Sequence, residues 1–377
     1  MAVISYLTTV DFDFGAIDRL GAALRGLGIR RPLLVSDRGV EAAGILDRIR
    51  ARIPNEIVVA TFLDTPPNPT EAAAKAALAV YRAEGCDGLL AVGGGSAMDL
   101  AKAVGLLHTH PGPLKDYALI EGGLARIQPI LPPLVAIPTT AGTGSEVGRG
   151  AVIILEDGRK LALISPHLIP KLAICDPELT LELPPALTAG TGMDALTHCI
   201  ETYLAPAVNP PAEAIALDGL ARAAANIERA THQGRDRQAR WEMMMAAMEG
   251  ALAFQKGLGA VHAMSHPLGG LPGRQLHHGT LNAVILPTVL AFNADHVGAK
   301  YAKIRAVVGL PEGADLSDWI RDLNRRLGLP PNLRAMGVRE DDIPALAPLA
   351  EKDHTNATNP RPATAADYAR LYREALG

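Results

Sequence analysis

The chain has 377 residues, enough for two domains that each bury their own core. Charged residues make up 20% of it and the formal net charge is −4, which excludes the basic surface typical of a protein that binds nucleic acid or an acidic membrane. We therefore expect a small-molecule partner. The three cysteines lack CxxC spacing, no apolar run reaches membrane-spanning length, and no basic signal-peptide segment begins the sequence, so we expect a reduced, cytoplasmic protein.

The first half of the chain alternates short β-rich apolar runs with helical patterns. The expected strands are 31–37, 56–62, 85–95 and 132–140, and the expected helices are 39–53, 69–85 and 96–107. This alternation predicts a parallel sheet wrapped by helices. Between two apolar runs in 151–165, the pair Asp157-Gly158 predicts a β-hairpin that interrupts the alternation.

Strand patterns stop at Pro184-Pro185, and helical periodicity continues to the end of the chain. We therefore predict two domains with a boundary near Leu183. Residues 1–183 should form an α/β domain with a Rossmann-like parallel sheet and a hairpin. Residues 184–377 should form an all-helical domain.

Two loops rich in small residues follow predicted strands. The run Gly93-Gly94-Gly95-Ser96 opens a helix, so its backbone N–H groups are suited to hold a phosphate at the helix N-terminus. It departs from G-x-G-x-x-G because Met98 occupies the last glycine position, and a tight turn without a ligand remains the alternative. The loop 139–146 combines small hydroxyls with glycine. Two such loops on one sheet predict a dinucleotide along the strand ends.

Asp37 ends the first of the apolar strands. An acidic side chain there can accept hydrogen bonds from an adenosine ribose and would repel a 2′-phosphate, which favours NAD over NADP. Asp37 is equally suited to be the N-cap of the helix that begins at Gly39. The two roles do not exclude each other.

A second kind of site is indicated by histidines. The stretch 257–287 places four of them between apolar residues and glycines: His262, His266, His277 and His278. Histidine is the commonest side-chain metal ligand, and several imidazoles in an apolar setting are costly to bury unless something binds them. Upstream, Asp194 and His198 stand four residues apart, on one face of a predicted helix. Together these residues predict a metal site in the helical half.

Five segments carry a resemblance to a known family. In this order and spacing, GGGSAMDLAK, PTTAGTGSE, CDPELT, GMDALTHCIE and GLGAVHAMSHPLGG resemble the iron-dependent (group III) alcohol dehydrogenases, from the first strand to at least Asn293. The resemblance implies the architecture that this family shares with dehydroquinate synthase, and NAD as cofactor. It also implies a divalent metal. Fe(II) is preferred because four protein ligands would close a tetrahedral zinc site, while Zn(II) stays possible because of its intrinsic affinity. A homodimer is the expected assembly.

The resemblance also assigns roles to residues. The family's metal ligands fall on Asp194, His198, His262 and His278; His278 is chosen because a glycine follows it, and His277 is the alternative. His266 matches a non-ligand histidine beside the nicotinamide, suited to proton transfer, and is the expected catalytic residue. Lys160 matches a lysine that contacts the cofactor ribose. The loops and the resemblance together predict these cofactor-binding residues: Asp37, Gly93, Gly94, Gly95, Ser96, Asp99, Thr139, Thr140, Thr143 and Lys160.

A finer likeness concerns the substrate. The segments YLTTVDFDFGAI, GRGAVIILEDGRKLALIS, AFQKGLGAVH and LHHGTLNAV are similar to the 4-hydroxybutyrate dehydrogenase branch, which implies NAD-dependent interconversion of 4-hydroxybutyrate and succinate semialdehyde. The carboxylate of such a substrate needs a cation, and Arg149, Lys256 and Arg274 are the candidates, each with a solvated surface charge as its alternative. Three other functions stay open: a general primary-alcohol or diol dehydrogenase, a sugar-phosphate lyase on the same fold, and a nucleotide-binding protein without catalysis. The segment 186–293 shows no obvious cluster of arginine and lysine for the phosphate of a lyase substrate.

Overall fold

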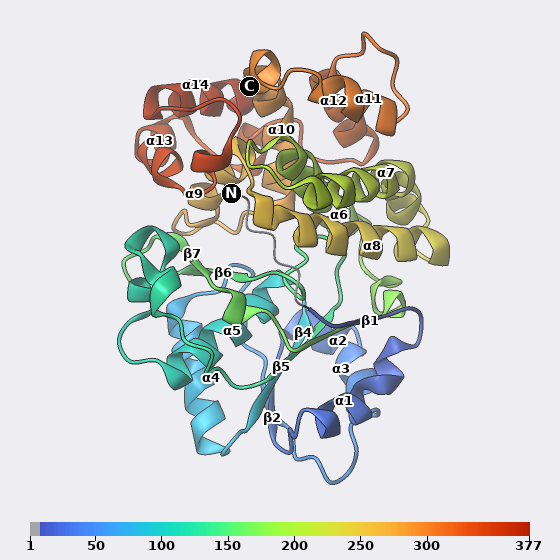
Figure 1. Cartoon of the computed structure of the whole chain (residues 1–377), viewed down its shortest axis with the longest axis vertical. Helices are drawn as coiled ribbons and strands as arrows, with labels where there is room; N and C mark the ends of the chain where they lie inside the picture. Colours follow the sequence, from blue (N-terminus) through green and yellow to red (C-terminus); the bar gives the residue numbers. More distant parts are fainter. Residues whose placement is uncertain (1–7) are drawn as a thin grey trace. The chain divides into compact units, whose positions relative to one another are not determined.

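Two units make up residues 8–377, the part of the chain that the computed structural model describes (Figure 1). One unit comprises residues 8–140 and Gly144–Glu182, and the other comprises Ala141–Thr143 and Leu183–Gly377. The first seven residues of the predicted α/β domain lie outside the described residues.

A parallel sheet forms the centre of the α/β unit. Its six strands run in the order β1-β8-β5-β4-β2-β3, and each neighbouring pair is parallel. The strands are β1 (Val10–Phe12), β2 (Pro32–Val35), β3 (Ala60–Phe62), β4 (Gly88–Gly93), β5 (Leu134–Pro138) and β8 (Leu172–Cys175). Strands β2, β4, β5 and β8 are buried throughout, as expected for near-continuous apolar runs in a sheet covered on both faces. The predicted parallel sheet is confirmed.

Helices cover both faces of this sheet. They are α1 (Leu20–Gly26), α2 (Arg38–Ala42), α3 (Ile45–Arg50), α4 (Glu71–Ala83) and α5 (Gly95–Thr109). Because side chains alternate along a strand, Leu33 and Val35 of β2 pack into the core under α4 and α5, whereas Leu34 packs into the core under α1 to α3. The same pattern continues in β4.

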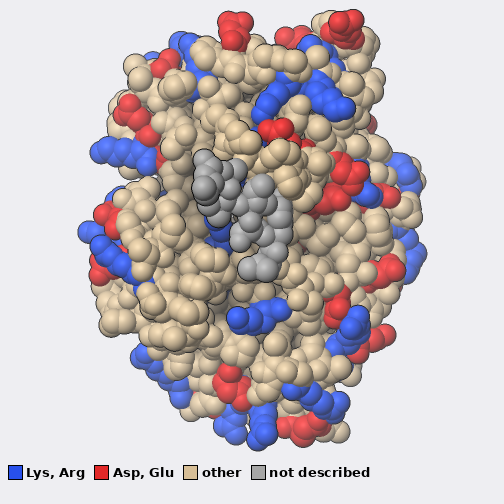
Figure 2. Space-filling model, viewed as in Figure 1, with Lys and Arg blue, Asp and Glu red and all other residues tan. Residues whose placement is uncertain are grey.

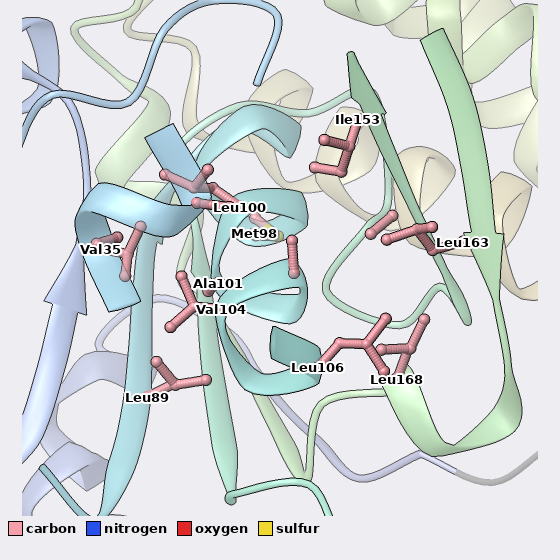
Figure 3. Close-up of a cluster of buried hydrophobic side chains, with 14 of the residues drawn as sticks. Val35, Leu89, Met98, Leu100, Ala101, Val104, Leu106, Ile153, Leu163 and Leu168 are labelled. Carbon is pink, nitrogen blue, oxygen red and sulfur yellow. The ribbon is translucent and has the colours of Figure 1, made fainter. Parts of the chain in front are cut away.

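The hairpin of β6 (Gly150–Ile154) and β7 (Lys160–Ile164) belongs to the α/β unit and is antiparallel, as predicted. Figure 3 shows α5 between the sheet and this hairpin: Met98 and Leu106 of α5 lie among side chains of the strands and those of Ile153 and Leu163. The hairpin therefore completes the core on one face of the sheet.

Two expectations for local structure are wrong in detail. The helix expected over 39–53 is two helices, α2 and α3, because Gly44 between them adopts φ 71°, a left-handed conformation that ends a helix. The strand expected over 56–62 is reduced to β3, which pairs with β2 only at Ala60–Phe62.

The second unit is helical in all its secondary structure from Leu183 onward, which confirms the expected all-helical half. Its α-helices are α6 (Pro185–Leu204), α7 (Pro210–His232), α8 (Arg237–Ala253), α9 (Ala260–Gly269), α10 (His278–Asn293), α11 (Lys300–Val307), α12 (Leu316–Arg326), α13 (Ile343–Lys352) and α14 (Ala365–Leu376). Helix α6 begins at Pro185, where proline's missing N–H and fixed φ suit the first helical turn. It packs against α7, α8 and α10 and is buried along most of its length.

The surface and the helix lengths bear on possible partners. On the face shown in Figure 2, basic and acidic side chains of the described residues are interspersed, without a field of one sign. Over residues 8–377, every helix is too short or too polar to cross a lipid bilayer.

Candidate functional site

The helical unit brings α6 and α10 into backbone contact at two glycines. A Cβ atom added to Gly279 would lie 2.2 Å from the carbonyl oxygen of Gly190, so no other residue fits there without moving a helix. Asp194 lies one turn after Gly190 on α6, and His278 directly precedes Gly279 on α10. The close crossing therefore places Asp194 against His278.

Four of the predicted site residues meet at this crossing. The Nε2 atoms of His198, His262 and His278 lie 3.7, 3.8 and 3.7 Å from Oδ1 of Asp194. A tetrahedral ion with ligand bonds of about 2.1 Å holds its ligands about 3.4 Å apart. The donor atoms of Asp194, His262 and His278 all lie within 4.8 Å of one another, so these three residues form a group that fits a divalent ion. His198 adds a fourth nitrogen near the same carboxylate oxygen.

Burial keeps an imidazole neutral, the form that can bind a metal. His198 and His262 are almost fully buried and their rings stack with centroids 4.8 Å apart. Burial lowers the pKa of His198 to about 4, so this imidazole is neutral near pH 7 and keeps a lone pair for a metal.

His277, the alternative ligand, faces its own helix instead. It is the N-cap of α10, where Nδ1 accepts a hydrogen bond from the backbone N–H of Thr280 at 3.3 Å and lies 2.9 Å from the Thr280 hydroxyl. The structure therefore brings His278, and not His277, to Asp194.

Glu201 is part of this site and was missed in the sequence. Its Oε2 lies 2.6 Å from Nδ1 of His262, and its Oε1 accepts from the backbone N–H of Val261 at 2.7 Å. Burial acts to lower the pKa of His262, but the hydrogen bond and charge of Glu201 outweigh it, and the net direction is upward. Because Glu201 accepts from Nδ1–H, the lone pair of His262 lies on Nε2, the ring nitrogen that faces Asp194. The signal was present, because Glu201 lies two helical turns after Asp194 on the same face.

We expect Glu201→Gln to weaken metal binding, because the amide keeps the shape of the side chain but loses the charge that makes His262 a strong donor. Loss of such an outer partner typically costs about 10- to 100-fold in metal affinity. Competition with a chromophoric chelator measures the change in Zn(II) affinity. The matched control is Glu228→Gln, which removes an exposed carboxylate paired with Arg326. Equal affinities for both variants and the unsubstituted protein would contradict this role for Glu201.

His266 lies beside the four residues but is held by a different carboxylate. Its Nδ1 is 2.9 Å from Oδ2 of Asp353, and its ring stacks on those of His278 and His354, with centroids 5.6 and 5.8 Å away. The other oxygen of Asp353 accepts from the backbone N–H and the hydroxyl of Thr355 at 2.9 and 2.7 Å. An imidazole held in this way has a fixed orientation and presents Nε2 as a proton acceptor.

Asp353 and His354 were also missed. They follow α13, far from the histidine segment in sequence, and no local spacing marks them. With His266 they form a second group whose donor atoms lie within 4.8 Å of one another. Burial lowers the pKa of His354 to about 4. Burial acts to raise the pKa of Asp353, but the charge and hydrogen bond of His266 outweigh it and the net direction is downward.

Most of the predicted cofactor residues lie in the α/β unit, at the carboxyl ends of three adjacent strands. The strand order reverses between β2 and β4, which is where open α/β sheets bind nucleotides. Asp37 follows β2, the glycine run ends β4, and Thr139-Thr140 follows β5. A Cβ atom added to Gly93 would lie 2.9 Å from Cβ of Ala97, so the turn into α5 requires glycine.

The N-terminus of α5 suits a phosphate. Its N-cap, Gly94, offers no side-chain cap, and no acidic residue lies in the first turn, so neither satisfies the N–H groups there. A Cβ atom on Gly94 would lie 3.4 Å from the Thr140 hydroxyl, and one on Gly93 would lie 3.7 Å from Oδ2 of Asp37. Asp37 also caps α2, accepting from the backbone N–H of Val40 at 3.0 Å, so the N-cap interpretation describes its local role.

The remaining cofactor predictions have partners of their own. Asp99 accepts from the Ser145 hydroxyl at 2.6 Å and from the backbone N–H of Val152 at 2.9 Å. Lys160 donates to the Asn68 side chain at 2.8 Å. Thr139 makes a backbone hydrogen bond to Gly93. Thr143 falls in the helical unit with Ala141 and Gly142.

Two of the three candidate substrate cations are engaged elsewhere, which corrects those expectations. Lys256 is buried, and its ammonium donates to carbonyls at the C-terminal end of α6, those of Thr202 at 2.9 Å and Tyr203 at 3.3 Å, as well as that of Ala205, and pairs with Glu213. It is a helix-capping cation with no donor left for a substrate. Arg274 makes two hydrogen bonds to Asp342.

Arg149, the third candidate, is half-buried between Gly148 and Gly150. Burial lowers the pKa of Arg149, though arginine stays charged at neutral pH. The loop that carries it is fixed by Lys102, a buried residue whose ammonium donates to the carbonyls of Gly148 and Gly150 at 2.9 and 2.8 Å. Lys102 lies within GGGSAMDLAK and was not singled out in the sequence.

Comparisons with known proteins cover the whole chain. Residues 8–177 match the model "Iron-containing alcohol dehydrogenase", and residues 188–376 match "Fe-containing alcohol dehydrogenase family, C-terminal". A 4-hydroxybutyrate dehydrogenase from Cupriavidus necator is 57% identical over 383 residues, covering 100% of both chains. The crystal structure of a 1,3-propanediol oxidoreductase is 36% identical with a TM-score of 0.90, over 100% of both chains. That of sulfoacetaldehyde reductase from Bifidobacterium kashiwanohense in complex with NAD+ is 26% identical with a TM-score of 0.88, also over 100% of both.

Both halves of the chain match the family models, and the relatives match it from end to end. The chain therefore belongs to the iron-containing alcohol dehydrogenase family and is an oxidoreductase.

Proposed function

We propose that this enzyme interconverts 4-hydroxybutyrate and succinate semialdehyde with NAD. The observation that carries the proposal is the 57% identity over the full chain to a protein named 4-hydroxybutyrate dehydrogenase. Membership of the family implies NAD and iron or another divalent metal.

Asp194, His198, His262 and His278 are the proposed metal ligands. Their support is the common approach of three imidazoles to one carboxylate oxygen in a buried setting. Fe(II) is the preferred ion, and Zn(II) is the alternative. When bound, the ion supplies Lewis-acid stabilisation of charge on the substrate oxygen, and NAD supplies a hydride acceptor.

The α/β unit would hold the cofactor. The backbone of Gly93 to Gly95 and the N-terminus of α5 would bind its phosphates, and Asp37 would bind the adenosine ribose, which favours NAD. We also propose Asp99, Thr139, Thr140, Thr143 and Lys160 as residues that line the cofactor, with Ser96 beside the glycines.

His266 is the proposed group for proton transfer. Oxidation of an alcohol releases a proton as well as a hydride, and the proton needs an acceptor near the substrate. Asp353 holds Nδ1–H of His266, so Nε2 is left to accept the proton, either directly or through the cofactor ribose.

Arg149 is the proposed partner of the substrate carboxylate, and its support is its half-buried position in the loop that Lys102 fixes. Hydrogen bonds to a charged group contribute about 1.5–3 kcal/mol, so Arg149→Gln should raise KM for succinate semialdehyde roughly 10- to 100-fold. KM for butanal, which has no carboxylate, should stay unchanged. The control is Arg159→Gln in the β6–β7 hairpin, whose guanidinium pairs with Asp157. An equal rise in KM for both aldehydes would contradict the assignment.

The substrate itself is tested by an aldehyde panel. We expect kcat/KM with NADH to be far higher for succinate semialdehyde than for butanal or 3-hydroxypropanal. Comparable values would favour the second candidate, a general primary-alcohol or diol dehydrogenase, which the likeness to 1,3-propanediol oxidoreductase supports.

A further inference from the structure

Asn282 lies among the proposed metal ligands. It stands one helical turn after His278 on α10 and is fully buried. Its Nδ2 lies 2.7 Å from Oδ1 of Asp194 and 3.2 Å from Nε2 of both His262 and His278. These three atoms are the donor atoms of three of the four proposed ligands.

The direction of the hydrogen bond follows from charge. A carboxylate only accepts, so an amide 2.7 Å from Oδ1 of Asp194 must present its NH₂ group, because the reverse orientation would place two acceptor oxygens together. The amide oxygen of Asn282 has no hydrogen-bond partner among the described residues. A buried polar group left unpaired costs free energy. Because the oxygen has no hydrogen bond to fix it, the contacts of the nitrogen hold this side chain in place.

We propose that Asn282 is a positioning residue of the metal centre. Its NH₂ group holds the oxygen of Asp194 that would bind the ion, and its side chain covers the face of the donor set formed by Asp194, His262 and His278. A carboxylate can turn about χ2 and exchange its two oxygens, and a fixed donor selects one of them. This inference rests on the ligand set proposed above.

Asn282 and Glu201 then act in parallel on different ligands. Glu201 orients His262 by accepting from Nδ1, and Asn282 orients Asp194 by donating to Oδ1. Partners of this kind fix the directions of metal ligands before the ion arrives, and their loss typically costs about 10- to 100-fold in metal affinity. The effect of Asn282 should therefore appear in metal binding itself and not only in turnover.

The test uses Asn282→Leu, which keeps the approximate volume and removes the donor, in the full-length protein. Chelator competition gives the Kd for Zn(II), and the visible spectrum of the Co(II)-loaded protein reports ligand geometry. We expect a Kd about 10- to 100-fold higher than that of the unsubstituted protein, with a changed Co(II) spectrum. Asn282→Ala, which leaves a small cavity instead, should also raise the Kd for Zn(II). It replaces the leucine variant if that variant does not fold.

The matched control is Asn324→Leu. Asn324 is also a buried amide. It donates to the carbonyl of Ala283 on α10 at 2.6 Å and has an unpartnered oxygen, and its hydrogen bond goes to none of the four proposed ligands. Its replacement should lower stability and leave Kd and the Co(II) spectrum unchanged. Unchanged metal binding in both Asn282 variants, or an equal loss in Asn324→Leu, would overturn the inference. If instead the proposed ligand set itself is wrong, Asp194→Ala will keep its metal, and this result separates the two kinds of failure.

Discussion

Replacing Asp194 with alanine is expected to remove bound metal and turnover together. Asp194 is the only carboxylate of the proposed ligand set, and its Oδ1 lies 3.7–3.8 Å from the Nε2 atoms of three imidazoles. Without it the ion loses its one anionic ligand. Lewis-acid stabilisation contributes several kcal/mol to such a reaction, so kcat/KM should fall by about 10³-fold or more. Elemental analysis of the purified variant and NADH oxidation with succinate semialdehyde measure the two effects.

Cofactor binding should survive in Asp194→Ala, because the proposed phosphate and ribose contacts belong to the α/β unit. Titration of NADH fluorescence checks this. Asp218→Ala is the control, since Asp218 is a more exposed carboxylate that pairs with Arg222 on α7. Stoichiometric metal in Asp194→Ala would refute the ligand set. His278→Ala should also lose the metal while His277→Ala keeps it, and the opposite pattern would show that the family ligand was assigned to the wrong histidine.

Replacing His266 with alanine is expected to have a different outcome, with the metal retained and the rate lost. Nδ1 of His266 contacts the carboxylate of Asp353, not that of Asp194. General acid–base groups typically contribute about 10²- to 10⁴-fold, and kcat should fall within that range. Elemental analysis and steady-state kinetics on one preparation separate the two roles.

Two further variants define the role of His266. Asp353→Asn should lower kcat less than His266→Ala, because the imidazole remains but its tautomer is no longer fixed. His296→Ala, an exposed histidine on the same unit, is the control. If His266→Ala kept the normal kcat, or lost its metal as Asp194→Ala should, the assignment of proton transfer to His266 would fail.

The fold was predictable where the sequence pattern is local. An apolar run bounded by glycines marked β4, and one between Pro133 and Thr139 marked β5. Asp157-Gly158 marked the hairpin, and Pro184-Pro185 marked the change to helices. The break between α2 and α3 was missed because it depends on a single glycine in a left-handed conformation. Helical periodicity on both sides of Gly44 hid that break.

The site was predictable only as far as helical spacing reaches. The i,i+4 pair of Asp194 and His198 was visible, and Glu201 and Asn282 stand at helical intervals from ligands without being recognised. Asp353 carries no local signal, because its contact with His266 arises from tertiary packing. Lys256 was misassigned for the same reason: its position before α9 suggested a role in the site, but the carbonyls at the end of α6 bind its ammonium.

Metal removal tests the central claim most directly. NADH oxidation by succinate semialdehyde should be measured on the purified protein, again after chelation with metal content determined in the same sample, and again after addition of Fe(II) or Zn(II). We expect turnover to disappear when the metal is removed and to return when about one ion per chain is bound. The metal-free protein should still bind NADH. Full turnover by protein shown to contain no metal would contradict the account.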